Sequence, residues 1–136
     1  MKFFTLASED GATIPCYEWG VSQPKGFVQI VHGMGEHAKR YDWTARQLNK
    51  AGYYVIANDQ RGHGGTIRKI PGDMGVDGWM QSLKDAYRVN SFIFFLFSLR
   101  VPPIRCGVGV RQVTLVFPYS PYPPSAMGWP LGKLHW

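Results

Sequence analysis

Cysteine, acidic residues and long apolar runs are all scarce in this sequence of 136 residues. The two cysteines, Cys16 and Cys106, stand far apart in the chain, which argues against a disulfide framework and against a cysteine-based zinc site. The longest apolar run, residues 92–99, has about half the length of a bilayer-spanning helix. The apolar run at the N-terminus is too short for the core of a signal peptide. We therefore expect no membrane-spanning segment, and a protein of the reducing cytoplasm.

Acidic residues are absent from the last third of the chain. All nine lie between Glu9 and Asp85, whereas residues 91–136 carry four basic residues. The net charge of +6 therefore comes mostly from a tail without acids and not from a basic stripe, which argues against a nucleic-acid partner. The same tail holds seven of the ten prolines, a composition that does not favour a regular helix or an inner strand. We predict two regions, a folded part over residues 1–90 and an irregular, proline-rich tail over residues 91–136.

The first half of the chain has the pattern of an α/β fold. Residues 2–7 and 13–19 predict an antiparallel hairpin, in which Pro15 indicates that the second strand lies at the edge of the sheet. Residues 27–31 and 53–57 are short apolar runs typical of buried parallel strands. A helical pattern between these two runs completes a βαβ unit.

Residues 41–51 have apolar side chains at helical spacing, and Gly52 stands where such a helix would end. A second helix is predicted after Asp77, which can cap it. Four apolar residues of this helix share one face, which we expect to be buried. They are Trp79, Met80, Leu83 and Tyr87. The aromatic run within residues 92–99 then predicts a buried strand or an exposed sheet edge.

Two glycine-rich segments directly follow the two strands of the βαβ unit. The first, H-G-M-G-E-H at residues 32–37, has glycines on both sides of Met34. Such glycines allow a tight turn that points a backbone amide outward, as an oxyanion hole requires, so the Met34 N–H is the candidate donor. The second, D-Q-R-G-H-G at residues 59–64, follows the next strand. Both segments therefore stand at the edge of the sheet where functional loops gather.

Together these segments resemble the N-terminal half of the α/β-hydrolases, in particular the lysophospholipase, monoacylglycerol lipase and serine aminopeptidase-like group. The resemblance covers residues 3–90 and includes Asp10-Gly11, Trp19 and the two glycine-rich loops. It implies an incomplete α/β-hydrolase sheet, made of the hairpin and the βαβ unit. It also implies hydrolysis of the carboxylic ester of a small lipid by a serine acyl-enzyme route, without a cofactor.

The resemblance assigns one oxyanion amide to the residue matching Met34 and a loop-shaping role to the other loop residues. These are His32, Gly33, Gly35, Glu36, His37, Asp59, Arg61, Gly62, His63 and Gly64. We expect the Arg61 guanidinium to pair with a loop carboxylate, such as Asp59, and not with a substrate. Thr66 departs from the family, which usually has serine near this position.

A larger departure is the lack of a nucleophile. The family carries a serine in a G-x-S-x-G motif after the next strand, but residues 102–109 hold no serine, and no serine of the chain has this flanking pattern. No acid follows Asp85, and the late His135 has no carboxylate near it in the sequence. We interpret the abrupt change of composition at about Ser91 as a frame change or a truncation, and we predict a chain without ester turnover.

Three alternatives remain open from the sequence. Residues 33–38 also fit G-x-G-x-x-A, and Asp59 ends the next strand as a ribose-binding acid would, which would indicate a dinucleotide site. His32, His37 and His63 suggest a metal site, but they lack partners at ligand spacing, so we predict none. The aromatic run and the basic tail would suit a non-catalytic module that binds a partner or a membrane surface. The oligomeric state cannot be derived from these patterns.

Overall fold

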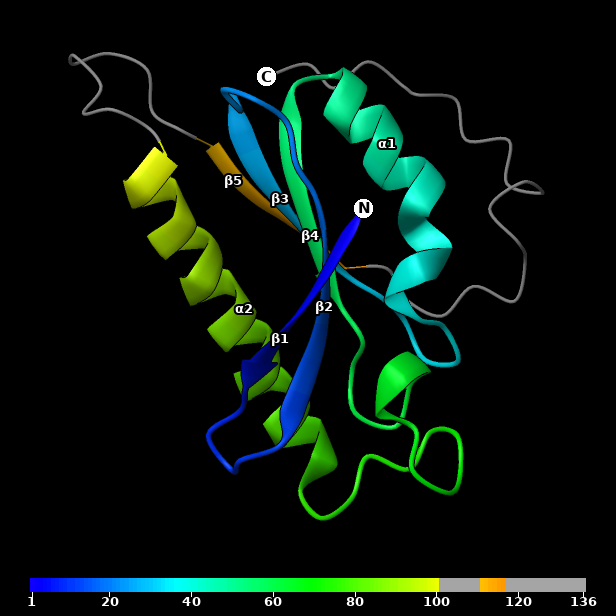
Figure 1. Cartoon of the computed structure of the whole chain (residues 1–136). Helices are drawn as coiled ribbons and strands as arrows, with labels where there is room; N and C mark the ends of the chain where they lie inside the picture. The colour runs from blue at the N-terminus through cyan, green and yellow to red at the C-terminus, as the bar shows by residue number, and fades with distance from the viewer. Residues whose placement is uncertain (101–110, 117–136) are drawn as a thin grey trace.

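The computed structural model describes residues 1–100 and 111–116, which form one mixed sheet with a helix on each face (Figure 1). The sheet has five strands in the order β1-β2-β4-β3-β5. The strands are β1 (Lys2–Ala7), β2 (Thr13–Trp19), β3 (Gly26–Val31), β4 (Tyr53–Asn58) and β5 (Arg111–Val116). The helical segments are η1 (Ala38–Tyr41), α1 (Asp42–Lys50), η2 (Gly64–Thr66) and α2 (Gly78–Arg100). No helix in this described part is long and apolar enough to cross a bilayer.

The predicted hairpin is confirmed, but its second strand does not lie at an edge. β1 pairs with β2 in antiparallel register from Lys2↔Glu18 to Ala7↔Thr13, and β2 pairs on its other side with β4. The prediction from Pro15 is wrong because the pairing of β2 with β4 stops one residue short of it, at Cys16↔Asn58. The Pro15 carbonyl accepts a hydrogen bond from Asp59 N at 3.0 Å, beyond the last registered pair. Its missing N–H therefore interrupts no ladder.

The predicted βαβ unit is also confirmed. β3 and β4 are parallel along their whole length, from Gly26↔Tyr53 to Val31↔Asn58. α1 ends at Lys50, and Gly52 adopts φ +89°, a left-handed conformation that glycine reaches without strain. At its other end the Trp19 indole donates a hydrogen bond of 2.8 Å to the Asp42 carboxylate, which fixes the start of the helix against β2.

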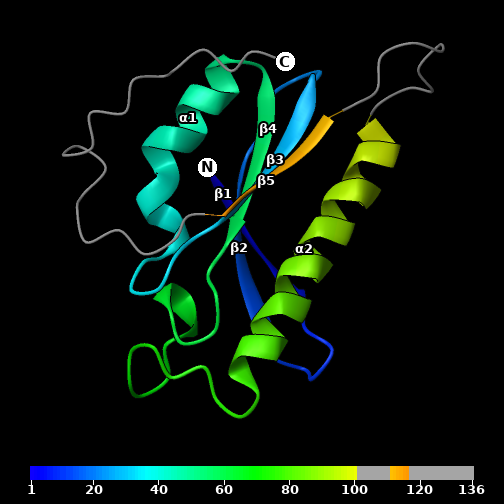
Figure 2. The ribbon, with the colours of Figure 1, turned by 180° about the vertical axis from the view of Figure 1, so that it is seen from behind.

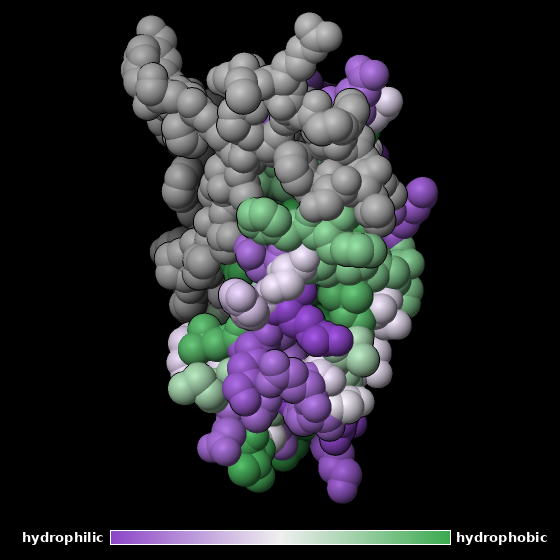
Figure 3. Space-filling model, turned by 90° about the vertical axis from the view of Figure 1, so that its left-hand side faces the viewer, coloured by the Kyte–Doolittle hydropathy of each residue, from purple (hydrophilic) through white to green (hydrophobic). Residues whose placement is uncertain are grey.

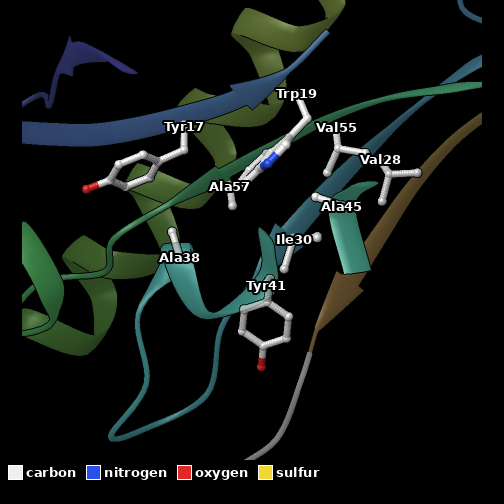
Figure 4. Close-up of a cluster of buried hydrophobic side chains, with 9 residues drawn as sticks. All are labelled: Tyr17, Trp19, Val28, Ile30, Ala38, Tyr41, Ala45, Val55 and Ala57. Atoms are coloured by element: carbon white, nitrogen blue, oxygen red, sulfur yellow. The ribbon is translucent and has the colours of Figure 1, made fainter. Parts of the chain in front are cut away.

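Side chains from both faces of the central strands form two separate cores. On the α1 face, residues of β2, β3 and β4 meet Ala38, Tyr41 and Ala45 (Figure 4). On the other face, Phe27, Tyr54 and Ile56 are among the residues that meet α2, and Figure 2 shows the two helices on opposite sides of the sheet. Since β3 and β4 contribute to both cores, their nearly continuous apolar sequences are explained.

The free cysteine Cys16 belongs to the core beneath α2. Burial raises the pKa of its thiol to about 12, and the nearby Asp59 and Asp85 carboxylates add to the shift. The thiol therefore stays protonated and behaves as a small apolar side chain. Cys106 lies outside the described residues.

α2 differs from the sequence prediction in two ways. It continues without a break to Arg100, so the prediction of a strand or sheet edge within residues 92–99 is wrong. The face with Trp79, Met80, Leu83 and Tyr87 is exposed, whereas Val89 and Ile93 of another face are buried against the sheet. The helix carries apolar residues around much of its circumference, and periodicity alone could not tell which face meets the sheet.

A strand of the tail lies beside β3. All six residues of β5 pair with β3 in parallel, from Gly26↔Arg111 to Val31↔Val116. Residues 92–99 belong to the helix that covers the sheet, and residues 111–116 extend the sheet. Most of the remaining proline-rich tail lies outside the described residues.

Gln29 fixes the position of α2 on the sheet. It is a buried polar side chain in the middle of β3, and both ends of its amide are used. Its Nε2 donates to the Ala86 carbonyl at 2.9 Å, and its Oε1 accepts from Asn90 Nδ2 at 3.0 Å. Because these two hydrogen bonds lie one helical turn apart, they fix the position of α2 along the direction of β3.

We predict that Gln29→Leu lowers the free energy of unfolding by about 1–3 kcal/mol, because the Asn90 amide loses its acceptor. The double variant Gln29→Leu/Asn90→Leu should recover part of that loss, since it removes the polar group left unpaired. Urea unfolding of the wild type, both single variants and the double variant forms a complete cycle. Strictly additive losses would show that the two side chains do not interact.

Candidate active site

The two glycine-rich loops meet at the carboxyl ends of β3 and β4 and enclose a cavity of about 300 Å³. Its walls come from the first loop, the second loop and the segment that follows it. The lining residues are Met34, Gly35, Glu36, His37, Gly62, His63, Gly64, Ile67, Pro71 and Gly72. Because β3 and β4 are adjacent and parallel, their C-terminal loops lie side by side, and the cavity forms between them.

The first loop makes a tight turn with Met34 at its tip. The Glu36 N–H closes the turn on the Gly33 carbonyl at 3.3 Å, and Gly35 has φ +75°. This left-handed conformation requires glycine in practice, as the sequence predicted for a tight turn. None of the described residues accepts a hydrogen bond from the Met34 N–H. Met34 therefore lines the cavity, and no described residue takes up its amide donor.

His32 anchors the base of that turn to the second loop. The backbone N–H of Gln60 donates to His32 Nε2 at 2.9 Å, so the ring proton must lie on Nδ1, which donates to the Gly33 carbonyl at 2.8 Å. The Gln60 side-chain amide also donates to the His32 carbonyl. Burial lowers the pKa of His32. The imidazole therefore stays neutral near pH 7 and serves as a bridge between the loops.

Asp59 holds three separate parts of the chain together. Its buried carboxylate accepts hydrogen bonds from Ala38 N at 2.8 Å, Gly65 N at 2.8 Å and the Tyr17 hydroxyl at 3.1 Å. These donors belong to the start of η1, to η2 and to β2. Burial and the Asp59 charge raise the pKa of Tyr17 to about 12, so the phenol remains a donor. Two loops and the sheet thus donate hydrogen bonds to one carboxylate.

Glu36 is a second buried carboxylate at the cavity. It accepts a hydrogen bond from the Tyr41 hydroxyl and pairs with Arg40 at 3.5 Å. Burial and the hydrogen bond to Glu36 raise the pKa of Tyr41, which therefore stays protonated. These contacts fix the end of the first loop to η1. His37, the next residue, has extended backbone and leads into η1, where its carbonyl accepts from Arg40 N at 3.1 Å.

Arg61 pairs with a loop carboxylate, as predicted, but this is Asp10 of the hairpin turn and not Asp59. Its Nη1 and Nη2 contact the Asp10 carboxylate at 2.6 and 2.9 Å, and its Nε contacts Asp85 of α2 at 2.8 Å. Nη2 also donates to Ser8 Oγ at 2.9 Å. The hydrogen bonds to Arg61 lower the pKa of Asp10 well below its usual range. The guanidinium points away from Asp59 because both of that carboxylate's oxygens are already engaged, whereas the hairpin and α2 offer two others.

The second loop is closed by His63 and Thr66. His63 Nδ1 lies 2.8 Å from the Arg61 carbonyl, and its ring centre is 5.3 Å from that of His32. The Thr66 hydroxyl lies 2.6 Å from the Gln60 carbonyl and accepts from His63 N at 3.0 Å. These contacts need only a side-chain hydroxyl, so threonine makes them in place of the family's serine.

The two alternative sites find little support in this geometry. The Asp59 carboxylate is buried and already accepts three hydrogen bonds from the protein, so a ribose hydroxyl would have to compete with these donors. Within residues 1–100 and 111–116, no group of three or more histidine, cysteine, aspartate or glutamate side chains could hold a metal ion. Residues 102–109, which hold no serine, and His135 lie outside the described residues.

Sequence reasoning missed several residues that shape the site. Gln60 bridges both loops, and Ser8 and Asp85 complete the Arg61 network, with Ser8 Oγ donating to Asp85 at 2.5 Å. Asp85 lies 24 positions after Arg61, and Ser8 lies 53 positions before it. No spacing rule connects such positions. The one available signal was Asp85 itself, a carboxylate in the first turns of α2 for which the sequence offers no role at the surface.

Gly64 tests how closely Asp59 and the second loop are packed. A Cβ on Gly64 would lie 2.4 Å from Asp59 Cγ, whereas a Cβ on Gly72 would meet nothing within 4 Å. Both glycines have positive φ, so alanine costs about 1–2 kcal/mol of backbone strain at either. We predict that Gly64→Ala lowers the free energy of unfolding by about 2 kcal/mol more than Gly72→Ala. Equal losses in urea unfolding would show that the Asp59 contact is not tight.

Comparison with known proteins agrees with the geometry. The sequence pattern of the family described as serine aminopeptidase, S33, matches residues 22–95. The monoglyceride lipase of Rattus norvegicus is 40% identical over 60 residues, which are 43% of this chain and 20% of that protein. The phospholipase YtpA of Bacillus subtilis is 33% identical over 52 residues, 38% of this chain and 20% of the relative. The chain thus spans about a fifth of the length of these relatives.

Solved structures share the fold. A thermostable carboxyl esterase from Bacillus coagulans superposes with a TM-score of 0.61 at 22% identity, over 83% of this chain and 34% of the esterase. A lipase in its open form gives 0.54 at 24% identity, over 85% and 35% of the two chains. Since the family match covers more than half of the sequence and includes both glycine-rich loops, the chain belongs to the serine aminopeptidase S33 family of α/β-hydrolases.

Proposed function

We propose that the cavity between the two loops binds the carboxylic ester of a small lipid, with the Met34 N–H contacting the ester carbonyl oxygen. The observation that carries this proposal is that Met34 lines a cavity between the loops while no described residue accepts a hydrogen bond from its N–H. A backbone amide held by a rigid turn is the kind of donor that stabilises a developing oxyanion.

The lining of the cavity suits an ester with an apolar chain. The Met34, Ile67 and Pro71 side chains supply apolar walls, and the glycines leave room near the backbone. The charged Glu36 is already satisfied by Tyr41 and Arg40, so it does not need a cationic ligand. Relatives named as monoglyceride lipase and phospholipase support the same substrate class.

We further propose that residues 1–136 alone do not hydrolyse such an ester. A serine with glycine at −2 and +2 is missing from the sequence, and no acid follows Asp85 to orient a late histidine. One oxyanion donor contributes about 10² to 10³ in rate to an enzyme that has a nucleophile, but it cannot replace one. The site would then bind the ester and leave it intact.

Binding is tested by NMR titration of the ¹⁵N-labelled chain with glyceryl monooctanoate, a soluble monoacylglycerol. We predict saturable shifts centred on the Met34 amide. Ile67→Asp should weaken binding by at least about tenfold, because it places a charge in the apolar wall. Ile70→Asp is the matched control, since Ile70 lies in the same segment, is exposed and does not line the cavity. Equal effects of the two variants, or no shift at Met34, would contradict the proposed site.

Turnover is tested separately with a fluorophosphonate probe and with release of octanoate from the same ester. We expect neither labelling nor release from protein whose circular dichroism shows it to be folded. A labelled serine would overturn the inactive part of the proposal, and mass spectrometry would identify that residue. Such a result would leave the binding part standing.

A further inference from the structure

The outward face of α2 carries a row of large apolar side chains. Trp79, Leu83 and Tyr87 follow one another at intervals of four residues, and their exposed fractions are 64%, 49% and 75%. Met80 is also more than half exposed. Residues four apart lie on one side of a helix, so these four side chains form a single ridge, which we call the α2 ridge.

The α2 ridge is exposed although α2 packs firmly against the sheet. The opposite side of α2 is fixed to the sheet by Val89 and Ile93, which are buried, and by the hydrogen bonds of Gln29 to Ala86 and Asn90. Arg61 adds a buried contact to Asp85 on the same inner side. Rotation of α2 to bury the ridge would break all of these contacts. The ridge therefore faces outward in the folded chain.

The size of the α2 ridge exceeds what scattered surface residues explain. Large apolar and aromatic side chains bury about 150–250 Å² each when fully covered. Four that are about half to three-quarters exposed present on the order of 400 Å² along two to three helical turns. Contiguous apolar patches of this size on soluble proteins are often functional.

The exposed charges of α2 beside the ridge are basic. Lys84 and Arg88 directly follow Leu83 and Tyr87, and both are exposed. Lys84 also forms a surface ion pair of 3.6 Å with the exposed Glu9 of the hairpin. The one acidic residue in this part of the helix, Asp85, is buried and paired with Arg61. Figure 3, which views the side of the molecule where α2 lies, shows hydrophilic and apolar side chains next to each other. The exposed surface of the helix is thus apolar and basic.

We propose that the α2 ridge docks onto an anionic lipid surface. Helices that lie in the interface of a membrane carry tryptophan, tyrosine and leucine on one strip, with lysine and arginine beside it. The exposed surface of α2 has this composition. The apolar side chains would enter the headgroup region, and Lys84 and Arg88 would contact phosphate or carboxylate groups. A second copy of the chain fits less well, because symmetric contact would bring the basic residues of both copies together.

This inference does not depend on the ester site, because the α2 ridge and the loop cavity share no residue. The docking surface could therefore be present even if the cavity binds no ester. The two proposals also fail separately, since a vesicle without any ester substrate tests the ridge alone.

The test is co-sedimentation of the full chain with vesicles of phosphatidylcholine alone or with about one-third phosphatidylserine. We expect binding to the anionic vesicles that weakens as salt is raised. Trp79→Ala/Tyr87→Ala should reduce binding at least about tenfold, because it removes the two aromatic members of the ridge. Lys84→Glu/Arg88→Glu should reduce it by about twentyfold or more, since each basic residue near such a surface contributes roughly fivefold.

Trp43→Ala is the matched control, because Trp43 is equally exposed but lies on α1, across the sheet. It should bind vesicles as the wild type does, and circular dichroism should show all variants to be folded. The proposal is overturned if the wild type does not bind anionic vesicles, or if Trp43→Ala loses as much binding as the ridge variants. It is also overturned if sedimentation velocity shows a dimer that the ridge variants abolish while vesicles are not bound.

Discussion

The site depends on one buried carboxylate. Asp59 directly follows β4, and its two oxygens accept hydrogen bonds from the start of η1, from η2 and from Tyr17 of β2. A buried carboxylate without donors would be costly, so the loops are held in the arrangement that supplies them. Gly64 fits against this carboxylate only because it lacks a Cβ. The cavity, the turn at Met34 and the path of the second loop all follow from this constraint.

A second charged network ties the site to the rest of the fold. Arg61 leaves the same loop and contacts Asp10 of the hairpin and Asp85 of α2, while His32 and Gln60 join the loop to the turn at Met34. Each of these groups has partners within the protein, which is how buried polar groups are tolerated. The arrangement is rigid and suited to hold one amide donor in place.

Much of the fold and part of the site could be predicted from the sequence. The short apolar runs gave β3 and β4, Gly52 gave the end of α1, and the glycines beside Met34 indicated the tight turn, because each signal acts locally. Three features could not be predicted in this way. Pro15 is tolerated inside the sheet because the neighbouring ladder stops just before it, α2 is apolar on more than one side, and Arg61 finds partners 24 and 51 positions away. Each depends on tertiary contacts that leave no spacing pattern.

The most direct test of this account is native-state hydrogen exchange at the amides of Ala38 and Gly65, measured by NMR. Ala38 begins η1 and Gly65 lies within η2, and the first amides of such short 3₁₀ segments have no hydrogen-bond acceptor within the segment. If Asp59 accepts hydrogen bonds from both, they should be protected, and Asp59→Ala should release both together while the amides of β3 stay protected. Exchange of either amide at the rate of an open loop in the wild type would contradict the central role of Asp59.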